Sequence, residues 1–349
     1  MGTVPFSAHE QGRHFARRLL RQMPIIIAVG VNLGVVPLLF IQLAYYRFFY
    51  PATILMAWFW LGIIALLIPA YYGVYAYALG LRSATDQDAL AQSVPAQPAA
   101  MPAWRIIAGW AAAVFFITIG FLFANGLSLM DHVGRWPQLW LDHSDAGAAL
   151  GTALNVGDPT LWPRWLLMFG FAIGTTAAWC VFDAEWLTRQ TVDETYRRWA
   201  WRFARILYTL SMFWAAAAGS WYVFGSWTEE LRHTMFSNPL LPLTVATAIA
   251  PGVGWAVLIA AGWLPAKRLA AAIAMLAQLG VLGVNAASRQ VVQNLNLKPY
   301  LNVLAQPTDV QWGPLVMFLA TFVVGLAVVA WMIAQVQKCG RAPSQSDRQ

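Results

Sequence analysis

Long unbroken runs of apolar residues constrain this sequence more than any other feature. A transmembrane α-helix needs about 20 consecutive, predominantly apolar residues to cross the hydrocarbon layer of a bilayer. Eight segments of the chain meet this requirement: 24–46, 52–79, 105–129, 165–187, 204–227, 241–263, 268–288 and 314–337. The sequence therefore predicts an all-α integral membrane protein with eight transmembrane helices.

The composition argues against the main alternatives. Only 11% of the residues are charged and 59% are hydrophobic, whereas soluble domains carry about 25% charged and about 45–50% apolar residues. The strands of a membrane β-barrel alternate apolar and polar residues over about ten positions, and these runs do not alternate. The net charge of +7 arises from basic residues between the spans, so it does not indicate binding to nucleic acid.

The distribution of basic residues orients the predicted helices. Cytoplasmic loops of membrane proteins are enriched in lysine and arginine. With the N-terminus inside, the cytoplasmic segments hold 16 of the 22 basic residues and the outer segments hold six. We therefore expect both termini in the cytoplasm, the lipid bilayer as the main partner, and the inner membrane of a bacterium as the location.

The predicted spans divide the chain into two halves of four helices. The parts are a basic cytoplasmic segment at 1–23, a first half at 24–187, a second half at 204–337 and a cytoplasmic tail at 338–349. The cytoplasmic segment 81–103 is rich in Ala, Gln, Pro and Ser, which is typical of flexible linkers. The long outer loops, 130–164 and 289–313, each join the third and fourth helices of a half.

This shared order of loops predicts an internal duplication. The third helix of each half also ends alike, with Asn125 and Ser128 in one and Asn285 and Ser288 in the other. Because each half begins inside, the repeat would be parallel and would form two four-helix bundles. The alternative is chance, since an Asn followed three positions later by Ser is a short pattern.

The same residues define a candidate ligand site. Side chains three and four positions apart share one face of a helix, so continuation of the predicted helix 268–288 beyond residue 288 would produce one polar stripe. We expect an outer cleft between the halves that could hydrogen-bond a quinone head or another small polar ligand. The alternative is a helix that emerges into water, with its arginine reaching lipid phosphates. The residues expected to line the cleft are Asn125, Ser128, Asn285, Ser288, Arg289 and Gln293.

The five histidines all lie outside the predicted spans, which excludes a haem held by two histidines in the bilayer core. His132 follows the third predicted helix, and His233 lies between the fifth and the sixth. Two imidazoles could ligate a haem iron, or they could hold another transition metal together with nearby carboxylates. The alternative is that both are loop histidines in contact with water.

Acidic residues are scarce in the predicted spans. Asp183 and Glu185 lie at the inner end of the fourth helix, and we interpret them as ion-pair partners of the basic stretch 189–205. No predicted span has a charged residue at its centre, which argues against proton-coupled transport through a midplane carboxylate.

Three functions fit these observations. The first is a membrane subunit of a respiratory or electron-transfer assembly, which acts at the outer face through quinone or haem and has redox partner subunits. The second is a transporter or channel for a neutral or weakly polar solute, favoured by the parallel repeat and by Pro251, which predicts a break or kink in the sixth helix. The third is a scaffold protein without a ligand. We favour the first, because the polar residues gather at one face instead of forming a path across the bilayer.

Overall fold

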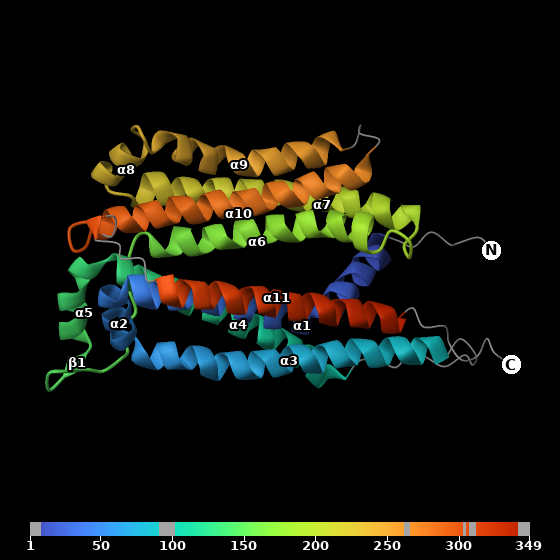
Figure 1. The fold of residues 1–349 in the computed structure, drawn as a ribbon, viewed down its shortest axis with the longest axis horizontal. Helices are drawn as coiled ribbons and strands as arrows, with labels where there is room; N and C mark the ends of the chain where they lie inside the picture. Colours follow the sequence, from blue (N-terminus) through green and yellow to red (C-terminus); the bar gives the residue numbers. More distant parts are fainter. Residues whose placement is uncertain (1–7, 91–101, 262–265, 303–304, 307–311, 341–349) are drawn as a thin grey trace. The chain divides into compact units, whose positions relative to one another are not determined.

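The computed structural model describes residues 8–90, 102–261, 266–302, 305–306 and 312–340 (Figure 1). This part of the chain is almost entirely helical, as predicted. The α-helices are α1 Ala8–Ala44, α2 Tyr46–Leu55, α3 Ala57–Leu90, α4 Ala103–Asp131, α5 Trp136–Asp142, α6 Leu161–Phe182, α7 Glu194–Ser220, α8 Glu229–Met235, α9 Leu241–Ala260, α10 Lys267–Leu297 and α11 Trp312–Gly340.

Short elements connect some of these helices. The 3-10 helix η2 spans Val133–Arg135, and two π-helical turns, η3 Asp183–Leu187 and η4 Trp221–Ser226, extend α6 and α7. A small antiparallel hairpin pairs β1 Ser144–Asp145 with β2 Ala148–Ala149. The predicted outer loop 130–164 therefore contains η2, α5 and this hairpin.

Seven of the described helices are long and apolar enough to cross a membrane, as in a multi-pass integral membrane protein. Their apolar stretches are Gln22–Ala44, Ala57–Gly80, Ala103–Asp131, Leu161–Leu187, Leu241–Ala260, Lys267–Leu297 and Trp312–Met332. The predicted span 204–227 is not among them. This segment lies on α7, which carries Arg202 and Arg205, and on the π-helix η4.

The chain forms two compact units, Met1–Leu301 and Asn302–Gln349. The second unit contains α11, and the side chains described between Trp312 and Met332 are exposed on every face of this helix. A helix that is apolar all round requires a membrane or a protein covering, so α11 has the character of a lipid-facing span.

Within the first unit, α6, α7, α9 and α10 form a closed four-helix bundle. Helix α6 packs against α7 and α10, and α9 packs against the same two helices (Figure 1). Helices α1, α3 and α4 form a second group, with α2 packed on α4. This grouping differs from the division predicted near residue 187, because α6 packs with the helices that follow it. The parallel repeat stays a prediction.

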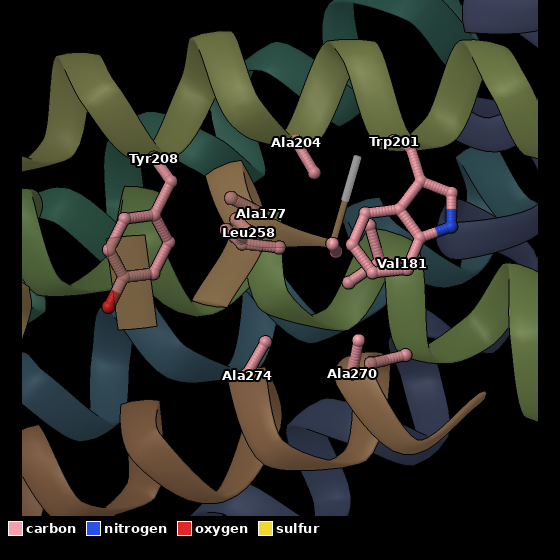
Figure 2. Close-up of a cluster of buried hydrophobic side chains, with 10 residues drawn as sticks. Ala177, Val181, Trp201, Ala204, Tyr208, Leu258, Ala270 and Ala274 are labelled. Atoms are coloured by element: carbon pink, nitrogen blue, oxygen red, sulfur yellow. The ribbon is translucent and has the colours of Figure 1, made fainter. Parts of the chain in front are cut away.

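Alanines allow the helices of the bundle to approach closely. Ala177 of α6, Ala204 of α7 and Ala274 of α10 are buried in one cluster, and Trp201 and Tyr208 of α7 fill the space beside them (Figure 2). Small residues at helix contacts shorten the distance between backbones and increase van der Waals contact in membranes. The core of the bundle thus alternates small and large side chains.

A buried polar layer crosses the same bundle. The Tyr208 hydroxyl donates to Gln278 Oε1 at 2.8 Å, and Gln278 Nε2 donates to the Phe171 carbonyl at 3.2 Å and to Thr175 Oγ1 at 3.1 Å. Gln278 is 2% exposed, and both its amide nitrogen and its amide oxygen form hydrogen bonds. This network therefore ties α6, α7 and α10 together, and the sequence reasoning missed it although Gln278 lies inside the predicted span 268–288.

Ion pairs lie at the end of the bundle where α6 ends and α7 begins. Arg189 lies 3.6 Å from the Glu185 carboxylate, which also accepts a hydrogen bond of 2.9 Å from Trp201 Nε1. This confirms the predicted pairing of Glu185 with the basic stretch. Asp183 instead accepts from Arg18 Nε at 3.0 and 3.1 Å, which attaches the first turns of α1 to the end of α6.

The connecting segments differ from the predictions in two places. Helix α3 continues to Leu90, so the first part of the predicted linker 81–103 is helical, while 91–101 lie outside the described residues. Helix α9 runs from Leu241 to Ala260 with Pro251 inside it, so the helix does not break there, while a kink at Pro251 stays a prediction. Residues 1–7, 303–304, 307–311 and 341–349 of the predicted terminal segments and second outer loop also lie outside the described residues.

Gly73 offers a test of the packing between α3 and α4. A Cβ atom added there would lie 2.7 Å from the Ala108 carbonyl oxygen, a backbone atom that cannot move without shifting α4. We expect Gly73→Ala to destabilise the protein by about 1–3 kcal/mol, measured as a lower melting temperature in detergent. Gly62→Ala, on the same helix, is the control because nothing lies within 4 Å of the added Cβ. Equal melting temperatures for both variants would contradict this packing.

Candidate functional site

A cavity of about 430 Å³ lies among α6, α7, α9 and α10, and we refer to it as the bundle cavity. Sites for small molecules typically enclose about 300–1,000 Å³. Most of the wall is apolar, with contributions from Leu167, Phe171, Ala215, Val245, Ile249 and Val292. Other wall residues, among them Met168 and Phe224, are exposed. The cavity therefore opens to the outside of the bundle through apolar side chains.

Polar side chains enter the wall from three elements that meet at one end of the bundle. Arg164 lies near the start of α6, Tyr222 lies in η4 just after α7, and Asn285, Ser288 and Arg289 lie toward the end of α10. The start of α6 and the ends of α7 and α10 are at the end of the bundle that carries α8 (Figure 1). We call this the polar end of the cavity.

Arg164 forms the strongest electrostatic contact at the polar end. Its Nη1 donates to Asp131 Oδ2 at 2.6 Å, and the two side chains are 10% and 5% exposed. A buried charge without a partner is strongly destabilising, so this ion pair is needed to hold Arg164 inside the protein. Arg164 Nη2 and Asp131 Oδ1 remain without a hydrogen-bond partner.

Arg289 adds a second guanidinium group. Its Nη1 lies 3.9 Å from Met168 Sδ, and in the part of the chain that the structure describes no carboxylate lies within ion-pairing distance of it. Arg164 and Asp131 are close enough to act on it electrostatically. The polar end thus combines the guanidinium groups of Arg164 and Arg289 with the carboxylate of Asp131, and the buried Asp158 carboxylate also acts on Arg164.

Several neighbouring polar groups also lack hydrogen-bond partners within the described residues. Trp227, which lines the cavity, has a buried Nε1 without an acceptor. Asn285 and Ser288 are each 8% exposed, and their side chains form no hydrogen bond with any residue in the described ranges. Because buried polar groups without partners are costly, these groups indicate that water or a ligand binds at the polar end.

The structure separates the residues that the sequence placed in one cleft. Asn285, Ser288 and Arg289 lie together on the cavity wall, because α10 continues without a break to Leu297. Gln293 is on the same helix but not on the wall, and its Nε2 is buried without a partner. Asn125 and Ser128 of α4 do not line the cavity.

Asn125 and Ser128 belong to a separate buried network. The Asn125 Oδ1 accepts from the Asn155 backbone N–H at 3.1 Å, and Asn155 Nδ2 donates to Ser128 Oγ at 2.9 Å. The Ser128 hydroxyl donates to the Asp158 carboxylate, which also accepts from the backbone N–H of Thr160 at 2.9 Å. These contacts attach the segment 155–160 to the end of α4.

The two candidate haem or metal histidines have different surroundings. His132 Nδ1 lies 3.3 Å from Asp158 Oδ2 and 3.1 Å from the Ser128 carbonyl oxygen. His233 is exposed on α8. Within the described ranges, no contact joins the two histidines, and no group of three or more His, Cys, Asp or Glu residues is arranged to hold a metal ion.

Sequence reasoning missed Arg164, Asp131 and Trp227 as parts of a site. A signal for the ion pair was available, because Asp131 lies just beyond the predicted span 105–129 and Arg164 just before the span 165–187. Opposite charges at the ends of two spans on the same side of the membrane can pair across the interface between those helices. Only the packing of the bundle places the indole of Trp227 on a cavity wall.

No protein-family model, curated protein or solved structure matches this chain. The function is therefore inferred from the geometry and chemistry of the bundle cavity.

Proposed function

We propose that this protein binds a membrane-soluble amphipathic ligand in the bundle cavity, with the head of the ligand at the polar end. One observation carries the proposal. The cavity joins an open, apolar wall to a polar end at which Arg164 and Trp227 have buried N–H groups without acceptors. A lipid-soluble molecule with a polar head matches both regions, since its chain fits the apolar wall and its head supplies the missing partners.

The orientation of the cavity follows from the topology that we propose. Helix α7 packs along α6 and α9, which supports an eighth crossing. With eight crossings both termini would lie on one side of the membrane, and the basic residues of the inner segments favour the cytoplasmic side. Arg197, Arg198, Arg202 and Arg205 lie in the first half of α7, away from the polar end. Because basic residues favour the cytoplasmic side, the polar end would lie near the outer face of the membrane.

A quinone is one ligand of this chemical class. Its carbonyl oxygens would accept hydrogen bonds from the guanidinium and indole N–H groups, and its isoprenoid chain would follow the apolar wall. These donors support a role as the membrane subunit of an electron-transfer assembly, in which redox partner subunits would exchange electrons with the quinone. The alternative is a solute transporter, for which α9 offers a proline within a continuous helix and not a broken helix.

Filling the cavity tests the proposal. Ala248 lies on the cavity wall and is exposed, so a tryptophan there would occupy the cavity without displacing packed side chains. We expect Ala248→Trp to reduce the amount of co-purifying amphiphile about tenfold, a loss equivalent to about 1.4 kcal/mol of binding free energy. The measurement is mass spectrometry of an organic extract of the purified full chain.

Ala246→Trp provides the matched control for this experiment. Ala246 is also exposed on α9, two positions away, but it does not line the cavity. The control should retain the ligand of the unmodified protein, and both variants should melt at similar temperatures. The same set of bound molecules in all three proteins would contradict ligand binding in the cavity.

A further inference from the structure

We infer that the head of the bound ligand is an anion, a carboxylate or a phosphate at the end of a long apolar chain. This inference rests on the proposed function and specifies its ligand. The first observation is the charge balance at the polar end. Asp131 forms an ion pair with Arg164 and acts on Arg289 only from a distance, and within the described ranges no carboxylate forms an ion pair with Arg289.

The position of Arg289 makes its unpaired charge expensive. The residue lies within the apolar stretch Lys267–Leu297, and the like charge of Arg164 acts on it. Charged side chains in membrane spans are costly and normally pair with an opposite charge. An anion bound between Arg164 and Arg289 would remove the repulsion, and guanidinium groups form paired hydrogen bonds with carboxylate and phosphate oxygens.

The unused hydrogen-bonding groups point to the same chemistry. Arg164 Nη2 and Trp227 Nε1 are buried donors without acceptors, and neither group can accept a hydrogen bond. A ligand that satisfies both groups therefore supplies several hydrogen-bond acceptors. An ionised carboxylate offers about four lone-pair sites on two adjacent oxygens, whereas the two carbonyl oxygens of a quinone lie on opposite sides of its ring.

Contact with ordinary lipid headgroups at the membrane surface explains only part of this arrangement. A half-exposed arginine can extend to lipid phosphates, and Arg289 could do so. Arg164 is 8% exposed and Trp227 is also 8% exposed, so their free donors cannot reach the bilayer surface. A partner for them must enter the cavity.

Two matched pairs of probes test the charge of the head. Oleate and oleyl alcohol share one chain, and lysophosphatidate and monoolein share another, so each pair differs in the anionic group. We expect the anionic member of at least one pair to bind the full chain in detergent about tenfold more tightly than the neutral member. Preference for oleate would identify a free carboxylate, and preference for lysophosphatidate would identify a phosphate ester.

Variants of two arginines connect this preference to the site. Arg289→Gln should bind the anionic and neutral probes with similar affinity, and Arg289→Lys, which keeps the charge, should retain part of the preference. Arg47→Gln is the control, because Arg47 is exposed over the Tyr46 ring and does not line the cavity. An anion preference that persists in Arg289→Gln would overturn the assignment to this residue.

The outcomes separate this inference from the proposed function. Equal binding of charged and neutral probes, abolished by Ala248→Trp, would overturn the anionic head and leave a cavity for a neutral head such as a quinone. Absence of binding for every probe, together with no co-purifying amphiphile, would overturn the proposed function itself.

Discussion

Replacing Asp131 with asparagine is expected to destabilise the protein by about 3–5 kcal/mol, the usual effect of removing one partner from a buried ion pair. The reason is that Arg164 would keep its charge in a site where it is 8% exposed. The hydrogen bond of 2.6 Å from Arg164 Nη1 to Asp131 Oδ2 would also lose its charged acceptor. The measurement is the midpoint of denaturant unfolding in a fixed detergent.

A double-mutant cycle separates the ion pair from the packing around it. Arg164→Met removes the other charge and leaves Asp131 unpaired, so it should be destabilising as well. The double variant Asp131→Asn with Arg164→Met contains no buried charge at this position, and we expect it to be less destabilised than the sum of the single variants. Additive effects of the two substitutions would contradict a direct interaction between these side chains.

Asp158→Ala is expected to release the segment 155–160 from α4 and to destabilise the protein by about 3 kcal/mol, since hydrogen bonds to charged groups contribute about 1.5–3 kcal/mol each. The Asp158 carboxylate is buried and accepts from the Ser128 hydroxyl and from the backbone and side chain of Thr160. The measurement is amide hydrogen exchange in peptides that cover 150–165.

The control for this substitution is Asp142→Ala. Asp142 is exposed on α5 and accepts one side-chain hydrogen bond, from Gln138. It should leave exchange in 150–165 unchanged. Unchanged exchange in Asp158→Ala would show that other contacts hold the segment, such as the hydrogen bond of 2.9 Å from the Ala153 backbone N–H to the Leu55 carbonyl.

The long helices could be predicted from the sequence, because a long run of apolar residues is a local feature of the chain. The predicted spans 105–129 and 241–263 correspond to α4 Ala103–Asp131 and α9 Leu241–Ala260. The short helix α2 Tyr46–Leu55 was not predicted. Its residues continue the apolar composition of their neighbours, so no change in composition marks its two ends. The predicted span 204–227 is covered by α7 and η4 but is not among the segments apolar enough to cross a membrane, so the eighth crossing stays a prediction.

The candidate site was predictable only where it lies on one helix. Asn285, Ser288 and Arg289 share a face of α10 because of their spacing, and that face lines the cavity. Arg164 and Trp227 come from other elements, and their place in the wall depends on the packing of α6 and α7 with α10. The predicted halves placed α6 in the first four-helix bundle, whereas α6 packs with α7 and α10 in the structure. Asn125 and Ser128 lie on α4 and belong to the buried network with Asn155 and Asp158.

An experimental structure of the full chain, purified with its own lipids, would test the assignment of the bundle cavity as a ligand site. We predict elongated density in the cavity, with oxygen atoms of its head about 2.7–3.2 Å from the guanidinium groups of Arg164 and Arg289. A cavity that contains only water, or that is closed by side chains of the protein with Arg289 paired to a carboxylate of the chain itself, would contradict the assignment.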